Sequence, residues 1–237
     1  MTVQSQQTLR NRISCTGVGL HSGAKVSMTL HPAAPGTGIV FHRADVAGDK
    51  AVIRAVYDNV VDTMFCTTLG NEHGTRVATV EHLMAALMGC CIDNALIEVD
   101  GPEVPIMDGS AAPFVFLVEC AGLSSQAAPR RSIRILKRIE ARDGTRHASL
   151  APAPSFSVQF EIDFDNEVIS SQSCSFQPLN GAFKEHLCRA RTFGFLEDGD
   201  ALRARGFARG ASLENAVVVS GNRVLNEDGL RYEDEFA

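Results

Sequence analysis

A glutamate and a histidine that stand next to each other, Glu81 and His82, have the clearest chemical potential in this sequence. They lie in a segment whose apolar residues recur at the i, i+3, i+4, i+7 spacing of a helix with one buried stripe. This pattern predicts a helix over 79–89, with Thr79 at the N-cap. A neutral histidine is a good zinc ligand, and a neighbouring carboxylate could handle a metal-bound water. One histidine does not make a zinc site, so a polar pair at the solvated start of a helix remains the alternative.

The elements around this pair are predicted from periodicity and from turn residues. Apolar and polar residues alternate over 24–31, which is typical of a half-buried strand. A strand is predicted over 93–99, and a helix from Ser110 to about Ala121. The stretch 122–132, rich in Ser, Ala, Gly and Pro, is typical of a linker. Beyond it we expect strands from 133 to 164, helices over 182–189 and 196–205, and a strand over 215–220.

An internal repeat decides the predicted architecture. In each copy an Asn follows an acidic residue, and a Gly, an Asp-Gly pair and a Phe come later in the same order. The copies contain Asp93, Asn94, Gly101, Asp108 and Phe114, and then Glu214, Asn215, Gly221, Asp228 and Phe236. We therefore predict an α+β protein of two related sheet-plus-helix domains, residues 1–124 and 125–237.

The second copy stops soon after its Asp-Gly pair. The first copy continues into a helix of about a dozen residues, whereas only Leu230–Ala237 follow in the second. Isolated helices shorter than about 12 residues are marginal in water. We therefore expect this sequence to be cut inside an element, which leaves the second domain incomplete at its C-terminus.

Composition sets outer bounds on function. The formal net charge of −6 and the pI near 5.6 provide no basic field for nucleic acid. Seven cysteines without a C-x-x-C pair indicate reduced thiols in a cytoplasmic protein. No apolar run reaches the ~18 residues of a membrane span, so we expect none.

Several segments together resemble a known family, the UDP-3-O-acyl-N-acetylglucosamine deacetylases, which are zinc amidases of lipid A biosynthesis. The helix at 79–87 looks like the zinc-helix motif of that family. Four further segments match in family order across the chain: 16–23, 105–114, 189–195 and 224–236. The resemblance implies two α+β domains packed face to face with the active site between them, and a β-α-β insert in the second domain.

The resemblance also implies roles for three residues at the reacting centre. His82 would be a ligand of the Zn2+ cofactor, Glu81 the general base for the zinc-bound water, and Thr192 a hydrogen-bond donor to the oxyanion. The residues alone favour the alternative that Thr192 only ends a strand or satisfies backbone groups. The implied reaction is zinc-dependent hydrolysis of the N-acetyl group of UDP-3-O-acyl-N-acetylglucosamine, with release of acetate, by a cytoplasmic monomer.

Further residues would contact the substrate if the resemblance holds. Phe164 matches the aromatic residue that stacks on uracil, and Arg146 stands where the family commonly has lysine. Cys66 and Leu20 lie beside the implied metal pocket and cleft. The implied walls of the acyl-chain passage are Phe193, Phe195, Ala211, Ser212 and Leu213. Without the resemblance, the apolar members of this set would be assigned to an ordinary core.

Two departures from the family pattern bear on activity. Asn166 and Glu167 replace a His-Pro pair near the implied nucleotide site. A family helix that carries a His and, four residues later, an Asp, its second and third zinc ligands, would follow Phe236. With His82 alone we expect weak zinc binding and little turnover. The alternatives are therefore a catalytically incompetent, truncated relative that binds a nucleotide-sugar or acyl group, or a remnant without a stable fold.

Overall fold

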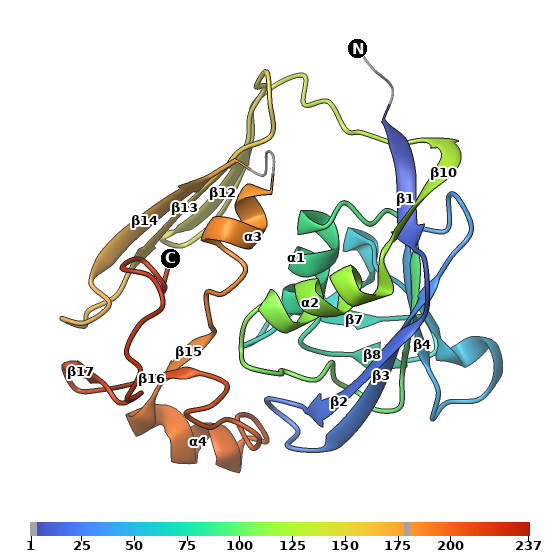
Figure 1. The fold of residues 1–237 in the computed structure, drawn as a ribbon. Coiled ribbons are helices and arrows are strands. Elements are labelled where there is room, and N and C mark those ends of the chain that lie inside the picture. The colour runs from blue at the N-terminus through green and yellow to red at the C-terminus, as the bar shows by residue number, and fades with distance from the viewer. Residues whose placement is uncertain (1–3, 178–180) are drawn as a thin grey trace.

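The computed structural model describes residues 4–177 and 181–237. The chain forms an N-terminal half and a C-terminal half (Figure 1). Helices α1 and α2 belong to the N-terminal half and lie between its sheet and the C-terminal half. The mixture of helices and strands confirms the predicted α+β class. No helix in the described ranges is long and apolar enough to cross a membrane.

A five-stranded mixed sheet forms the base of the N-terminal half. Its spatial order is β2-β3-β9-β4-β5, with β4 and β9 parallel and the other neighbours antiparallel. The bounds are Ile13–Val18 for β2, Lys25–Pro32 for β3, Ile39–Arg43 for β4, Val52–Arg54 for β5 and Ala95–Val99 for β9. Val26, Met28 and Leu30 on β3 are buried, so the predicted alternation is confirmed.

Two helices, α1 (Glu81–Gly89) and α2 (Ala112–Ala121), lie on the side of this sheet that faces the C-terminal half (Figure 1). Their apolar residues, among them Leu83, Leu87 and Phe114, join the main core with the inner face of the sheet. Both predicted helices are confirmed. Burial of these apolar faces, rather than helix propensity, supplies most of their stability.

The predicted N-cap is wrong. Val80 precedes the first turn of α1, and no side chain caps it. The Thr79 hydroxyl donates instead to Glu103 Oε1 at 2.9 Å, and Thr79 has a positive φ of 57°. The Thr79 hydroxyl therefore binds the buried carboxylate of Glu103 and does not cap α1.

The predicted linker is also wrong over most of its length. Residues Leu123–Pro129 form β10, which pairs antiparallel with β1 (Ser5–Leu9). Gln126 accepts a hydrogen bond from the Asn94 side chain at 2.7 Å. Composition misled here because this strand is held by its backbone ladder and by side-chain amide contacts of Gln6, Asn94 and Gln126, not by apolar alternation. β10 also crosses the predicted domain boundary at 124/125, which stays a prediction.

A small three-stranded sheet stands beside α1. It consists of β6 (Val60–Asp62), β7 (Thr68–Gly70) and β8 (Arg76–Val77), and short 3-10 turns at Gly48–Ala51 and Tyr57–Asn59 precede it. The segment between β6 and β7 carries Cys66 and passes close to the start of α1, because Thr67 N–H bonds to Glu81.

The C-terminal half contains two hairpins and a second small sheet. The hairpins are β11 (Ile139–Asp143) with β12 (Arg146–Leu150), and β13 (Val158–Asp163) with β14 (Ser171–Phe176). The sheet has β16 (Val217–Ser220) between β15 (Phe193–Phe195), which is parallel to it, and β17 (Arg223–Val224). Helices α3 (Ala182–His186) and α4 (Gly199–Ala204) are shorter than predicted.

The two halves meet through closely fitted contacts. Phe183 of α3 is buried in the main core, against Gly89 at the end of α1. Lys184 Nζ lies 2.7 Å from Glu119 Oε1 of α2. Thr192 N–H donates to Gly109 O at 2.8 Å, and a Cβ at Gly109 would collide with the carbonyl of Asn215. The site described next lies along this contact.

Candidate functional site

The first turn of α1 places Glu81 and His82 side by side at the junction of the halves. Glu81 Oε2 accepts the Thr67 N–H at 3.0 Å, which fixes one of its oxygens. Burial lowers the pKa of His82, and the charges of Glu81 and Asp108 raise it by less. The imidazole is therefore neutral at neutral pH, the form in which histidine binds a metal.

Glu81 also borders a cavity. A space of about 270 Å³ lies between α1 and the β6–β8 region, and Glu81 is the charged residue in its lining. The other lining residues are Ala55, Val56, Tyr57, Val60, Thr67, Leu69, Val80 and Met84. This setting gives the Glu81 carboxylate an apolar wall on one side.

A buried carboxylate, Glu103, braces the loop between β2 and β3. Its oxygens accept the His21 and Ser22 N–H groups, each at 2.8 Å, in addition to the Thr79 hydroxyl. Thr79 in turn approaches Cys66. Burial raises the pKa of the Cys66 thiol, but the nearby polar groups of His21, Thr68 and Thr79 lower it by more. The thiol is therefore more acidic than an ordinary cysteine.

Several residues here hold unusual backbone conformations. Phe65, Thr79 and Met107 have φ values of 63°, 57° and 57° although none is glycine. Such conformations cost free energy and cluster at functional sites, where the surrounding structure enforces them. Each of the three stands one to three residues from Cys66, His82 or Asp108.

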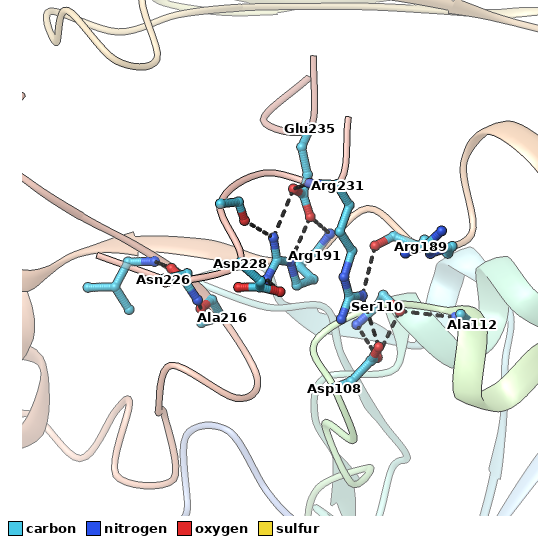
Figure 2. Close-up of polar contacts among 12 residues, drawn as sticks. Asp108, Ser110, Ala112, Arg189, Arg191, Ala216, Asn226, Asp228, Arg231 and Glu235 are labelled. Atoms are coloured by element: carbon cyan, nitrogen blue, oxygen red, sulfur yellow. Dashed lines mark hydrogen bonds and ion pairs between the residues drawn. The ribbon is translucent and has the colours of Figure 1, made fainter. Parts of the chain in front are cut away.

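An ion-pair network supports the site from the C-terminal half (Figure 2). Arg191 and Glu235 are both buried, with Nε 2.8 Å from Oε1. Arg191 also lies 3.4 Å from Asp228, and Arg231 Nη1 lies 2.9 Å from Asp108 Oδ2. Asp108 is thus tied to the C-terminal half while its charge reaches His82.

Thr192 is held on both sides by its backbone. Its N–H donates to Gly109 O and its carbonyl accepts Val217 N–H, each at 2.8 Å. The preceding residue, Arg191, is fixed by Glu235. These hydrogen bonds fix the backbone of Thr192 relative to the Asp108–Gly109 turn, and its side chain is half-buried.

An aromatic cluster brings three predicted substrate-binding residues together. The Phe164 ring, 37% exposed at the end of β13, lies 5.6 Å from the Phe193 ring and 6.0 Å from the Phe195 ring. Phe193 also contacts Phe236 at 5.1 Å. Phe164 is therefore neither a fully buried core residue nor isolated.

The remaining predicted contacts are spread over both halves. Leu20 is buried, and its carbonyl accepts Gly210 N–H at 3.0 Å. Ser212 N–H bonds to Asn215 Oδ1 at 2.9 Å, and neighbouring Leu213 is half exposed. Ala211 N–H bonds weakly to Ala208 O at 3.4 Å. Arg146 is exposed at the turn of the β11–β12 hairpin, opposite Asp143.

The metal-binding capacity of the described residues is limited. No group of three His, Cys, Asp or Glu side chains that could hold a metal lies within 4–177 and 181–237. A catalytic zinc needs three protein ligands. His82 is of the residue type that can supply one such ligand.

Two site residues escaped the assignment of roles from sequence. Asp108 stands out in the sequence only as a member of the internal repeat, yet it influences His82 and pairs with Arg231. The signal was present in the repeat, since Asp228, its counterpart, pairs with Arg191. Glu103 gave no signal, because its three partners are more than 20 residues away in sequence.

Comparison with known proteins gives consistent matches over nearly the whole chain. The family model for UDP-3-O-acyl N-acetylglycosamine deacetylase matches residues 6–237. Proteins named UDP-3-O-acyl-N-acetylglucosamine deacetylase from Acidithiobacillus ferrooxidans and Myxococcus xanthus are both 53% identical, over 233 and 232 residues. One from Shewanella frigidimarina is 50% identical over 233 residues. Each match covers 98% of this chain, and respectively 76%, 73% and 76% of the relative.

Proposed function

Since this chain belongs to the UDP-3-O-acyl N-acetylglycosamine deacetylase family, we propose that Glu81, His82 and Thr192 serve the reaction for which its relatives are named. That reaction, a step of lipid A biosynthesis, removes the N-acetyl group of UDP-3-O-acyl-N-acetylglucosamine. The observation that carries the assignment is that Thr192 bonds directly to the Asp108–Gly109 turn while Asp108 influences His82. In this proposal the base and the oxyanion donor would come from opposite halves.

In the proposed mechanism Glu81 is the proton carrier. Water attacks the acetyl carbonyl carbon as Glu81 takes one of its protons. The C–N bond then breaks as Glu81 returns this proton to the nitrogen, which leaves as a free amine, with acetate as the other product. The hydrogen bond from Thr67 leaves the second oxygen of Glu81 free for this role.

Thr192 would act on the charge that develops during attack. Its hydroxyl is a donor whose backbone is fixed by Gly109 and Val217. A donor that does not reorganise stabilises an oxyanion better than water does. The carbonyl oxygen of the acetyl group would face this hydroxyl.

Zinc is the metal that we propose for the site, with His82 as one ligand. The further ligands would have to come from outside the described residues. We therefore propose that residues 1–237 alone bind zinc weakly and turn over slowly, because affinity grows with ligand number.

The substrate would extend across the C-terminal half. The partly exposed ring of Phe164 would stack against uracil, and Phe193, Phe195 and the segment Ala211–Leu213 would line the path of the acyl chain. Arg146 would approach the diphosphate, and Cys66 and Leu20 would lie beside the metal pocket and the cleft. All seven cysteines are free thiols, which supports a reducing, cytoplasmic setting. A monomeric state stays a prediction.

A second function is favoured by one observation. Because the described residues supply a single candidate zinc ligand, the chain could bind the nucleotide-sugar or acyl group without hydrolysing it. Both the deacetylase and the binding module would use the aromatic cluster around Phe164, but only the deacetylase needs Glu81.

Two measurements on the purified chain separate the readings. Calorimetric binding of UDP-3-O-acyl-N-acetylglucosamine should be weakened by Phe164→Ala and unaffected by Phe156→Ala, an exposed control. Acetate release with added zinc should be slow and abolished by Glu81→Gln. Binding without any Glu81-dependent acetate would favour the binding module, whereas no binding at all would overturn both.

A further inference from the structure

The positively charged side chain of Arg205, outside the site already described, joins two segments from opposite halves. One is the loop that leads to Cys66, with Met64 and Phe65. The other follows α4 and contains Arg205 and Phe207. We call these four residues the Arg205 clamp.

The guanidinium of Arg205 lies against a pair of aromatic rings that contact each other. Its Cζ is 5.6 Å from the centroid of Phe65 and 6.0 Å from that of Phe207, and the two rings are 5.0 Å apart, edge to face. Nη2 also approaches Met64 Sδ at 3.3 Å. Such a cation attracts the face of each ring and holds both segments at once.

The clamp keeps apolar side chains at the surface in strained backbone. Phe65 is 52% exposed and Met64 is 49% exposed. Phe65 and Ala208 have φ values of 63° and 52°, which non-glycine residues rarely adopt. Ordinary core packing does not account for exposed rings, so another requirement must hold them.

Further contacts tie the second segment to the loop braced by Glu103. Phe207 meets the His21 ring edge to face at 5.3 Å, and Ala208 N–H donates to His21 Nδ1 at 3.3 Å. A Cβ at Gly210 would collide with the carbonyl of Gly19. The segment then continues directly into Ala211–Leu213.

We propose that Arg205 is a positioning residue that holds the Cys66 loop against the segment leading to Ala211–Leu213, and thereby orders the side of the site that receives the acyl chain. The part concerning the acyl chain rests on the proposed function. The part of the substrate that binds on this side of the site is apolar, because the clamp presents aromatic and thioether surfaces.

The first test measures loop opening without any catalysis. In the full chain, iodoacetamide alkylation of Cys66 is followed by peptide mass spectrometry, with exposed Cys120 as internal reference. Arg205→Ala should raise the Cys66/Cys120 rate ratio by about fivefold, as expected for loss of two cation–π contacts. Arg205→Lys should restore most of the protection. Arg203→Ala, which removes an exposed arginine of α4 paired with Asp200, should leave the ratio unchanged.

The second test addresses the acyl chain. Arg205→Ala should weaken binding of UDP-3-O-acyl-N-acetylglucosamine and leave that of UDP-N-acetylglucosamine, which lacks the chain, unchanged. Phe65→Leu, which keeps apolar bulk and loses the ring, repeats both tests if Arg205→Ala unfolds.

An unchanged Cys66 ratio in Arg205→Ala, or an equal rise in Arg203→Ala, overturns the clamp. A raised ratio with equal loss of both ligands overturns its link to the acyl chain. If the unmodified chain binds neither ligand, the proposed function and that link fall together, while the alkylation ratio still decides the clamp.

Discussion

At the residue scale, the stability of the site depends on a buried ion pair one position before Thr192. Arg191 binds Glu235 through Nε at 2.8 Å and Nη2 at 3.1 Å, and the N–H groups of Arg191 and Arg231 reach the same carboxylate (Figure 2). Burial raises the pKa of Glu235, but these hydrogen bonds lower it by more. Removing one partner would leave a buried charge without compensation.

We expect Glu235→Gln to lower the free energy of unfolding at pH 7 by about 3 kcal/mol. In the unmodified chain this contribution is complete above the unfolded pKa of about 4.3. It is lost as the pH falls through the lower folded pKa, because the unfolded state then binds the proton more readily. Urea denaturation from pH 7 to pH 3 should therefore show the two stabilities converging in acid.

The matched control is Glu214→Gln, which alters an exposed carboxylate shortly before β16. Its urea midpoint should follow the unmodified chain at every pH. A constant difference between Glu235→Gln and the unmodified chain down to pH 3 would contradict this account of the pair.

At the element scale, the close approach of α1 and α3 determines where the site lies. Gly89 ends α1 directly against the ring of Phe183, and a Cβ there would overlap the ring. Gly is unfavourable in a helix by about 1 kcal/mol relative to Ala. Its presence in the last turn therefore reflects the space that Phe183 needs.

Gly89→Ala should accordingly destabilise the chain by about 2 kcal/mol, despite the better helix propensity of Ala, because overpacking displaces Phe183. Met88→Ala changes a neighbouring exposed side chain and should alter the free energy of unfolding by less than about 0.5 kcal/mol. Thermal unfolding followed by circular dichroism measures both. A higher free energy of unfolding for Gly89→Ala would contradict this expectation, because it would show that the Phe183 ring can move away without loss of stability.

Periodicity predicted the elements whose stability comes from a buried face. α1, α2 and the alternation on β3 were visible because Leu83, Phe114 and Met28 recur at helix or strand spacing. β10 was missed because its residues pair through the backbone. The N-cap at Thr79 failed because Glu103, distant in sequence, takes its hydroxyl.

The candidate site was predictable only where a motif carried it. Glu81 and His82 stood out by residue type, whereas Thr192 and Phe164 were assigned through resemblance. No local pattern could show that Arg231 reaches Asp108 or that Arg205 stacks on Phe65, since those contacts depend on how the halves dock.

At the scale of the whole molecule, the two halves are joined at Gly109. Its φ of 83° and its contact with the Asn215 carbonyl both require glycine, and its own carbonyl holds Thr192. Gly144, at the β11–β12 turn, also has a positive φ of 57° but no neighbouring atom within 4 Å of a Cβ position. A comparison of substitutions at Gly109 and Gly144 therefore separates the contribution of the contact between the halves from that of backbone strain.

Gly144→Ala should cost about 1 kcal/mol, which is the penalty for the left-handed conformation alone. Gly109→Ala should cost clearly more, since it also pushes the Asn215 carbonyl away and displaces Thr192. Urea denaturation of the two variants gives the comparison. Equal losses would mean that the halves do not depend on this contact.

The central claim is that α1 presents His82 as the metal-binding corner of a hydrolytic site shared between the halves. Calorimetric titration of the metal-free chain with Zn2+ tests it directly, with His82→Ala compared with His73→Ala, an imidazole in the turn before β8. We expect weak binding by the unmodified chain and by His73→Ala, and binding weaker by at least about tenfold in His82→Ala. Equal zinc affinity in all three proteins would contradict the claim.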